Sequence, residues 1–105
     1  MSQRAGLRVQ ARQDAPGVAV LSVAGELDVS TAKTLEAAVE EACGAQPSEL
    51  LFDLRELRFM DSAGIAVLLS ASRKVPSVRL LDPSPAVRRV LEMTGLTTVL
   101  PFVDQ

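Results

Sequence analysis

The chain has 105 residues, with 11 basic and 13 acidic side chains and a formal net charge of −2. This length suits one compact domain with its own core, so we expect a single domain over residues 1–105. The chain holds no histidine, tyrosine or tryptophan, and we therefore expect neither an enzyme nor a bound metal or cofactor. Its basic residues form no stripe interleaved with aromatics, which argues against direct binding of nucleic acid.

The apolar runs are short. The longest, residues 18–24 and 64–69, fall far below the roughly 20 residues that a membrane-spanning helix needs, so we expect no membrane insertion. Residues 1–17 are polar, unlike a secretory signal, and the single Cys43 cannot form an internal disulfide. These features predict a cytoplasmic protein in which Cys43 fills space in the core.

The first part of the chain predicts a hairpin. In residues 7–12 apolar and polar side chains alternate, which is the pattern of a strand with one wet face. Asp14, Pro16 and Gly17 supply a turn. Residues 18–24 are almost continuously apolar, which predicts a second strand covered on both faces and antiparallel to the first.

A helix is predicted next, because apolar residues recur at helical spacing from Ala32 to Ala42. Ser30 or Asp28 can cap its start, and Gly44 marks its end. Residues 50–54 then form a short apolar strand, and residues 55–60 are read as a connection.

The second helix is expected from Asp61 or Ser62 to about Lys74, stopped by Pro76, with residues 65, 68 and 69 facing inward. Residues 78–81 predict another strand, and residues 99–103 a last strand, which Pro101 indicates either lies at a sheet edge or is interrupted there. Between them, Ser84 caps a helix that ends at residue 95.

The predicted element order is β-β-α-β-α-β-α-β. Strands joined through helices are parallel because such crossovers are right-handed. We therefore expect an α/β fold, with a small, mixed, mostly parallel β-sheet packed with α-helices.

The start of the second helix raises a question about Ser62. Either Asp61 or Ser62 can accept a hydrogen bond from a first-turn N–H group, so Ser62 can be an ordinary cap. Gly64 costs about 0.5 to 1 kcal/mol in a helix, which indicates that another backbone or protein comes close there. Phe59 and Met60 are either a hydrophobic staple on the helix or the rim of a docking surface.

Three stretches stand out together: GELDVSTA (residues 25–32), FMDSAGIAVL (59–68) and DPSPAVRRVLEMTGL (82–96). They resemble the signatures of the STAS domain, and more narrowly those of the bacterial anti-sigma factor antagonists, or anti-anti-sigma factors. The resemblance covers nearly the whole chain in order. It implies the STAS fold and a non-enzymatic role in transcription regulation by partner switching.

In that family the serine after the aspartate of the D-S-x-G motif is phosphorylated by the anti-sigma factor, which is itself a serine kinase. The resemblance places that serine at Ser62. The unphosphorylated form binds the anti-sigma factor and releases the sigma factor, phosphorylation abolishes binding, and a metal-dependent serine phosphatase restores it. Asp28 matches an acidic family position on a loop near the phosphoserine.

The partner-binding surface implied by the resemblance and the neighbouring hydroxyls has eight members. They are Asp28, Ser30, Thr31, Met60, Asp61, Ser62, Ala63 and Gly64.

The chain departs from the family pattern at Ala63, at Ala66, where the family often has a second glycine, and over residues 71–78. Ala63 stands where the family often has a second serine, which removes an alternative phosphate acceptor. Residues 71–78 are about a turn shorter than in typical members, which bears on partner choice.

Two alternative functions stay open from the sequence. One is a STAS regulatory subunit of an ABC-type membrane transporter assembly, and the other is a nucleotide-binding STAS sensor. The serine at the D-S-x-G position favours the antagonist over both.

Overall fold

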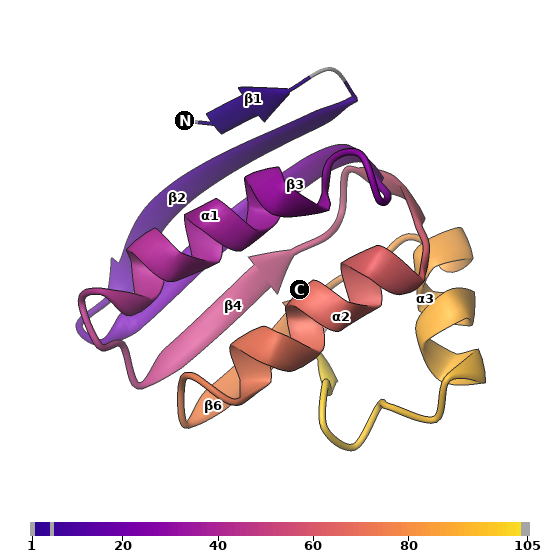
Figure 1. Ribbon diagram of the computed structural model, residues 1–105. Coiled ribbons are helices and arrows are strands. Elements are labelled where there is room, and N and C mark those ends of the chain that lie inside the picture. Colours follow the sequence, from indigo (N-terminus) through magenta and orange to yellow (C-terminus); the bar gives the residue numbers. More distant parts are fainter. Residues whose placement is uncertain (1, 5, 104–105) are drawn as a thin grey trace.

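The computed structural model describes residues 2–4 and 6–103, and Figure 1 shows one twisted sheet with helices packed against it. In this part of the chain the strands are β1 (Ser2–Arg4), β2 (Leu7–Ala15), β3 (Val18–Leu27), β4 (Glu49–Asp53), β5 (Leu57–Met60), β6 (Ser77–Leu81) and β7 (Phe102–Val103), and the helices are α1 (Ala32–Cys43), α2 (Ser62–Ser72) and α3 (Pro85–Met93).

The sheet is mixed, as predicted. Its strand order is β1-β2-β3-β4-β6-β7, and β5 lies beside β3 off this path. β1, β2 and β3 are antiparallel, whereas β3 pairs in parallel with β4 and β5, and β6 in parallel with β4 and β7. The predicted hairpin and the predicted parallel strands are therefore confirmed.

Strand β3 is long enough to hold two parallel neighbours in sequence. β4 pairs with its first half, residues 18–22, and β5 with its last part, residues 25–27. The register shifts between Gly25 and Glu26, so that Arg58 has no partner and forms a bulge in β5. Leu57 and Met60 consequently both reach the core although they are three positions apart.

The prediction of a mere connection over residues 55–60 was wrong, because β5 occupies most of it. The bulge at Arg58 breaks the period-two alternation that marks a strand in a sequence. β1 was also not predicted.

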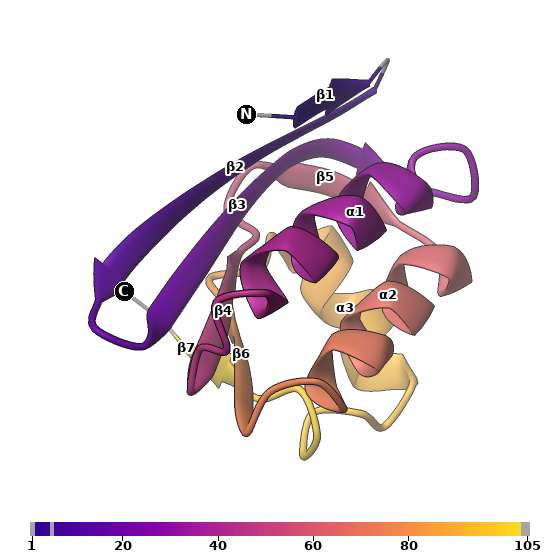
Figure 2. The same ribbon diagram turned by 60° about the vertical axis from the view of Figure 1, so that its left-hand side comes forward.

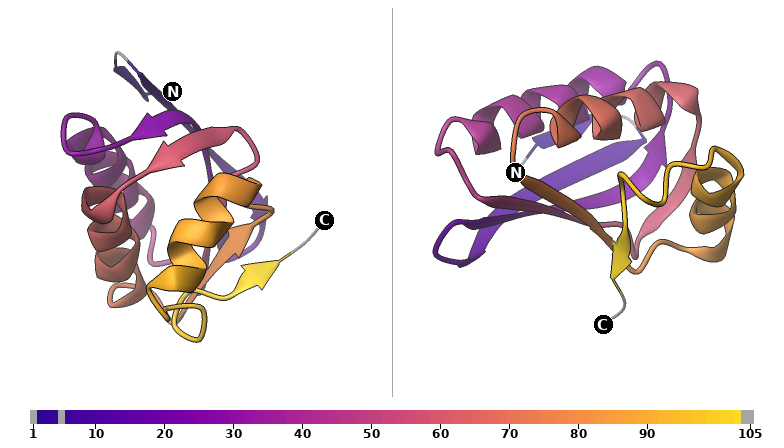
Figure 3. Two further views of the ribbon diagram at one scale, coloured as in Figure 1. Left: turned by 90° about the vertical axis from the view of Figure 1, so that its right-hand side faces the viewer. Right: turned by 90° about the horizontal axis from the view of Figure 1, so that it is seen from below.

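Helices α1 and α2 lie side by side on one face of the sheet, as the views in Figures 1 and 3 agree. α1 buries Leu35, Ala38 and Val39 against the sheet. In α2 the predicted Leu68 is fully buried, while Ile65 and Leu69 are only partly buried. α3 packs against β5 at one end of the molecule, away from the α1 and α2 layer.

The other predicted boundaries hold to within a few residues. α2 begins at Ser62 but ends at Ser72, before the predicted Lys74. The Ser84 hydroxyl caps α3 by accepting from the Val87 N–H at 3.4 Å, and it also donates to the Leu57 carbonyl at 3.0 Å. The last strand is shorter than predicted, and it lies at the sheet edge as expected.

Asp53 at the end of β4 is a buried carboxylate held by one arginine. Its exposed fraction is 6%. The Nε and Nη2 groups of Arg55 donate to its two oxygens at 2.9 and 2.7 Å. These hydrogen bonds lower the pKa of Asp53 although burial alone would raise it.

We predict that Arg55→Met destabilises the protein by about 1 to 3 kcal/mol at pH 7, because the buried Asp53 carboxylate loses the guanidinium and keeps only the backbone N–H of residue 55 as a donor. The lowered pKa means that this stabilisation is present above the ordinary Asp pKa of about 3.9 and is lost as the pH falls through the lowered value. Urea unfolding at neutral and acidic pH should therefore show the wild type and the variant converging in acid.

The matched control is Arg58→Met, which changes an exposed arginine in the bulge. It should shift stability by less than about 0.5 kcal/mol. Equal losses for the two variants would contradict a specific contribution of the Asp53 to Arg55 pair.

Candidate functional site

The carboxyl ends of β3 and β5 bring two loops together. Leu27 ends β3 and is paired with Met60, which ends β5. The Asp61 N–H donates to the Leu27 carbonyl at 3.2 Å. The loop that precedes α1 and the first residues of α2 therefore lie next to each other, at one end of the molecule (Figure 2). The carboxyl edge of parallel strands is where α/β proteins commonly place their sites.

Asp61, and not Ser62, caps helix α2. Its backbone is extended, with φ −115° and ψ −168°, and its carboxylate accepts from the Ala63 N–H at 2.9 Å. Ser62 is the first residue of the helix and its side chain is exposed. Within residues 2–4 and 6–103 the Ser62 hydroxyl makes no hydrogen bond, so it is open to chemistry in a way that a capping serine is not.

Asp28 organises the loop before α1. Its carboxylate accepts from the Ser30 hydroxyl at 2.6 Å and from the N–H groups of Ser30 and Thr31 at 2.9 and 3.2 Å. The hydrogen bond from Ser30 is the main reason that the pKa of Asp28 is lowered, so the carboxylate is ionised at neutral pH. Asp28 therefore adds a fixed negative charge beside the start of α2.

Thr31 stabilises the same loop through hydrogen bonds of its buried side chain. It is buried, its hydroxyl donates to the Glu26 carbonyl at 2.9 Å, and it accepts from the Asp28 N–H at 3.0 Å. Thr31 is also the residue at which α1 starts, without a capping bond from its side chain. The prediction that Ser30 or Asp28 caps α1 was therefore wrong, because the N-cap is Thr31 and the Asp28 carboxylate accepts only from residues 30 and 31, which precede the helix.

The eight predicted surface residues fall into three groups. Ser30 and Ser62 are exposed, whereas Asp28, Asp61 and Ala63 are partly exposed. Thr31, Met60 and Gly64 are buried, so they lie behind the surface and not on it.

Gly64 is required by packing inside the chain. A Cβ atom at this position would lie 2.7 Å from Cγ and Cδ2 of Leu27 and 2.7 Å from Cγ of Met60. The close approach that the glycine permits is therefore that of α2 to the ends of β3 and β5, and not that of another protein. Met60 is correspondingly part of the core and cannot form the rim of a docking surface.

The sequence-based predictions missed one exposed apolar side chain, Val29, and left the role of a second, Phe59, undecided. Val29 is 80% exposed at the tip of the Asp28 loop, and Phe59 is 48% exposed on β5. An apolar residue between the polar Asp28 and Ser30 is the signal that could have identified Val29. We call the exposed residues Val29, Ser30 and Ser62 the switch surface.

No helix among the described residues is long and apolar enough to cross a membrane. In residues 2–4 and 6–103, no three Asp, Glu or Cys side chains come close enough together to hold a metal ion.

The site and the fold define a class of protein. The model of the STAS domain family matches residues 10–105. The chain belongs to this family.

Relatives of known name narrow the class. The anti-sigma-F factor antagonist RsfB of Mycobacterium tuberculosis is 37% identical over 79% of this chain and 70% of its own length. A crystal structure of an anti-sigma factor antagonist from Mycobacterium paratuberculosis has a TM-score of 0.85 at 30% identity, covering 97% of this chain and 89% of that one. The Bacillus protein SpoIIAA in its phosphorylated form has a TM-score of 0.73 at 25% identity, covering 93% of this chain and 91% of that one.

We predict that Gly64→Ala destabilises the fold by about 1 to 3 kcal/mol, because the added methyl group overlaps Leu27 and Met60. Ala66→Leu is the matched control, since it enlarges an exposed side chain on the same helix and should change stability by less than about 0.5 kcal/mol. Chemical denaturation of both variants measures the difference. A Gly64→Ala variant as stable as the wild type would show that the glycine is not there for packing.

Proposed function

We propose that the chain is an anti-sigma factor antagonist whose unphosphorylated form binds an anti-sigma factor through the switch surface, and that phosphorylation of Ser62 abolishes this binding. The observation that carries the proposal is the exposed Ser62 hydroxyl at the first position of α2, where Asp61 already supplies the cap. The names of the relatives support the same role.

The position of Ser62 suits a phosphate that leaves the fold intact. The first turn of a helix has N–H groups without partners inside the helix, and its dipole favours negative charge. A phosphate at Ser62 meets both, so α2 persists when the serine is modified. The hydroxyl is not part of the core, and no packing is lost.

The effect of the phosphate falls on the switch surface. It adds about −1.5 to −2 charges beside the carboxylates of Asp61 and Asp28. A partner shaped to the neutral hydroxyl and to these two acids meets a bulky anion instead. A loss of about 3 kcal/mol in binding is enough to weaken the complex more than a hundredfold.

The partners follow from this assignment. The chain has no glycine-rich phosphate-binding loop of its own, so the phosphate is transferred in trans, by an anti-sigma factor that is a serine kinase. A metal-dependent serine phosphatase returns the chain to the binding form. The chain itself acts as a binding protein and not as an enzyme.

We predict that Ser62→Ala remains bound to its anti-sigma factor in the presence of ATP, whereas the wild type is released and Ser62→Asp binds at least tenfold more weakly. Co-purification with the anti-sigma factor, together with mapping of the phosphorylated residue, measures both effects. Ser70→Ala, on the same helix, is the control and should behave as the wild type. Equal binding by Ser62→Ala and Ser62→Asp would remove Ser62 from the mechanism.

Val29 tests the apolar part of the switch surface. An exposed valine at the centre of an interface is expected to contribute about 1 to 2 kcal/mol, so Val29→Ala should weaken anti-sigma factor binding by about 5- to 30-fold without affecting stability. Val99→Ala removes an exposed valine from the connection between α3 and β7 and serves as the control. Titration calorimetry that gave the same affinity for both variants would exclude Val29 from the interface.

A further inference from the structure

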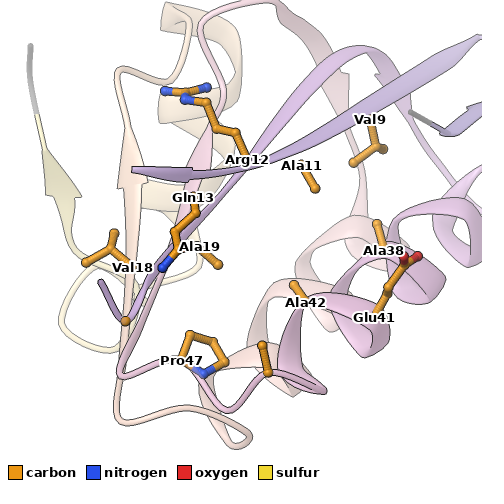
Figure 4. A pocket seen from close by; sticks show the side chains of 12 residues that line it. Val9, Ala11, Arg12, Gln13, Val18, Ala19, Ala38, Glu41, Ala42 and Pro47 are labelled. Carbon is orange, nitrogen blue, oxygen red and sulfur yellow. The ribbon is translucent and has the colours of Figure 1, made fainter. Parts of the chain in front are cut away.

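A concave site lies at the opposite end of α1 from the switch surface. It is a pocket of about 380 Å³ between the β2 and β3 hairpin and the last turns of α1 (Figure 4). Val9 and Ala38 form its buried floor, while Ala45 and Gly17 stand at its exposed margin. Its volume is in the range of natural pockets for small molecules.

The pocket exists because both of its walls carry small side chains. The helix contributes Ala38 and Ala42, and the hairpin contributes Ala11 and Ala19. Protein interiors are normally filled to the density of organic crystals, so facing alanines between a sheet and a helix leave open space. Apolar space of this kind binds apolar molecules in preference to water.

Hydrogen bonds hold the end of the pocket open. The Gly17 carbonyl at the hairpin turn accepts from the Ser48 N–H at 2.9 Å, from the Ser48 hydroxyl at 3.1 Å and from the Glu49 N–H at 3.1 Å. They join the hairpin turn to the segment that follows α1 and so restrain the position of the hairpin relative to the helix. The pocket is thus formed before any ligand arrives, which lowers the cost of binding.

The polar side chains that line the pocket favour a positively charged ligand. The Arg12 side chain points away from the pocket in Figure 4, and its guanidinium donates to the Ser22 hydroxyl at 3.0 Å. Gln13 is neutral. The Glu41 carboxylate lines the pocket and has no ion pair or hydrogen bond among the described residues. An apolar floor beside one unpaired negative charge complements an apolar molecule that carries a positive charge.

We propose that this pocket binds a small amphiphilic amine, with the apolar body on the alanine floor and the ammonium group at Glu41. The site is separate from Ser62 and does not depend on the proposed antagonist function. Two elements connect the pocket with the Asp28 loop: α1, whose last turns line the pocket, and β3, whose first residues line it and whose last residue precedes Asp28.

Nuclear magnetic resonance titration of the full chain with three probes tests the proposal. The probes are 4-phenylbutylamine, the neutral 4-phenylbutanol and the anionic 4-phenylbutyrate, which share one apolar body. The amine should shift the amide signals of Val9, Ala19 and Ala42 in a saturable way, with a dissociation constant on the order of 1 mM or tighter. The alcohol should bind more weakly and the carboxylate most weakly.

Variants separate the apolar and the charged parts of the site. Ala42→Leu fills the pocket from α1 and should weaken binding of the amine at least tenfold, and Ala45→Leu does the same from the exposed margin if Ala42→Leu fails to fold. Glu41→Gln should weaken the amine about three- to fivefold and leave the alcohol unchanged. Glu36→Gln, an exposed residue of α1 that does not line the pocket, is the matched control.

Three outcomes would overturn the proposal. They are the absence of saturable shifts, a carboxylate that binds as tightly as the amine, and binding that survives in a folded pocket-filling variant. Shifts of the pocket amides that grow with protein concentration in the absence of probe would also overturn it, because they would place a second copy of the chain in the pocket.

Discussion

The candidate site depends on one hydrogen bond, in which the Ala63 N–H donates to the carboxylate of Asp61 at the start of α2. Because the Asp61 carboxylate caps α2, the hydroxyl of the next residue, Ser62, is not needed as a cap. If a serine capped the helix, its hydroxyl would accept a hydrogen bond from a backbone N–H group. Phosphorylation of that hydroxyl would then disturb the fold. Here the Ser62 hydroxyl has no capping role at the positive end of the helix, so under the proposed function a phosphate at this position leaves the fold intact and changes the binding of a partner.

The sheet holds the start of α2, and with it the Ser62 hydroxyl, next to the loop that precedes α1. Strand β3 runs on beyond β4 and pairs with β5, so that both strands end side by side. The absence of a side chain at Gly64 lets α2 press onto Leu27 and Met60. The loop ordered by Asp28 is thereby held beside the start of α2, so under the proposed function a phosphate on Ser62 adds its charge close to the ionised Asp28 carboxylate.

Much of the fold could be read from the sequence because hydrophobic period and capping residues agree along most of the chain. The hairpin, the three helices and the Ser84 cap are examples. β5 could not be predicted, because the bulge at Arg58 places its two core residues three positions apart in the sequence, which breaks the alternation typical of a strand. At the site, the sequence indicated Ser62 and Asp61 but could not decide which one caps, since both residue types do so equally well. It also placed Met60 and Gly64 on the surface, because burial depends on contacts with β3 that are distant along the chain.

Comparing the unfolding free energies of Asp61→Ala and Ser62→Ala tests the central claim most directly. If the acid is the cap and the hydroxyl is free, Asp61→Ala should lose about 1 kcal/mol and Ser62→Ala should remain within about 0.5 kcal/mol of the wild type. A loss confined to Ser62→Ala would show that the serine holds the helix, and it would contradict the account.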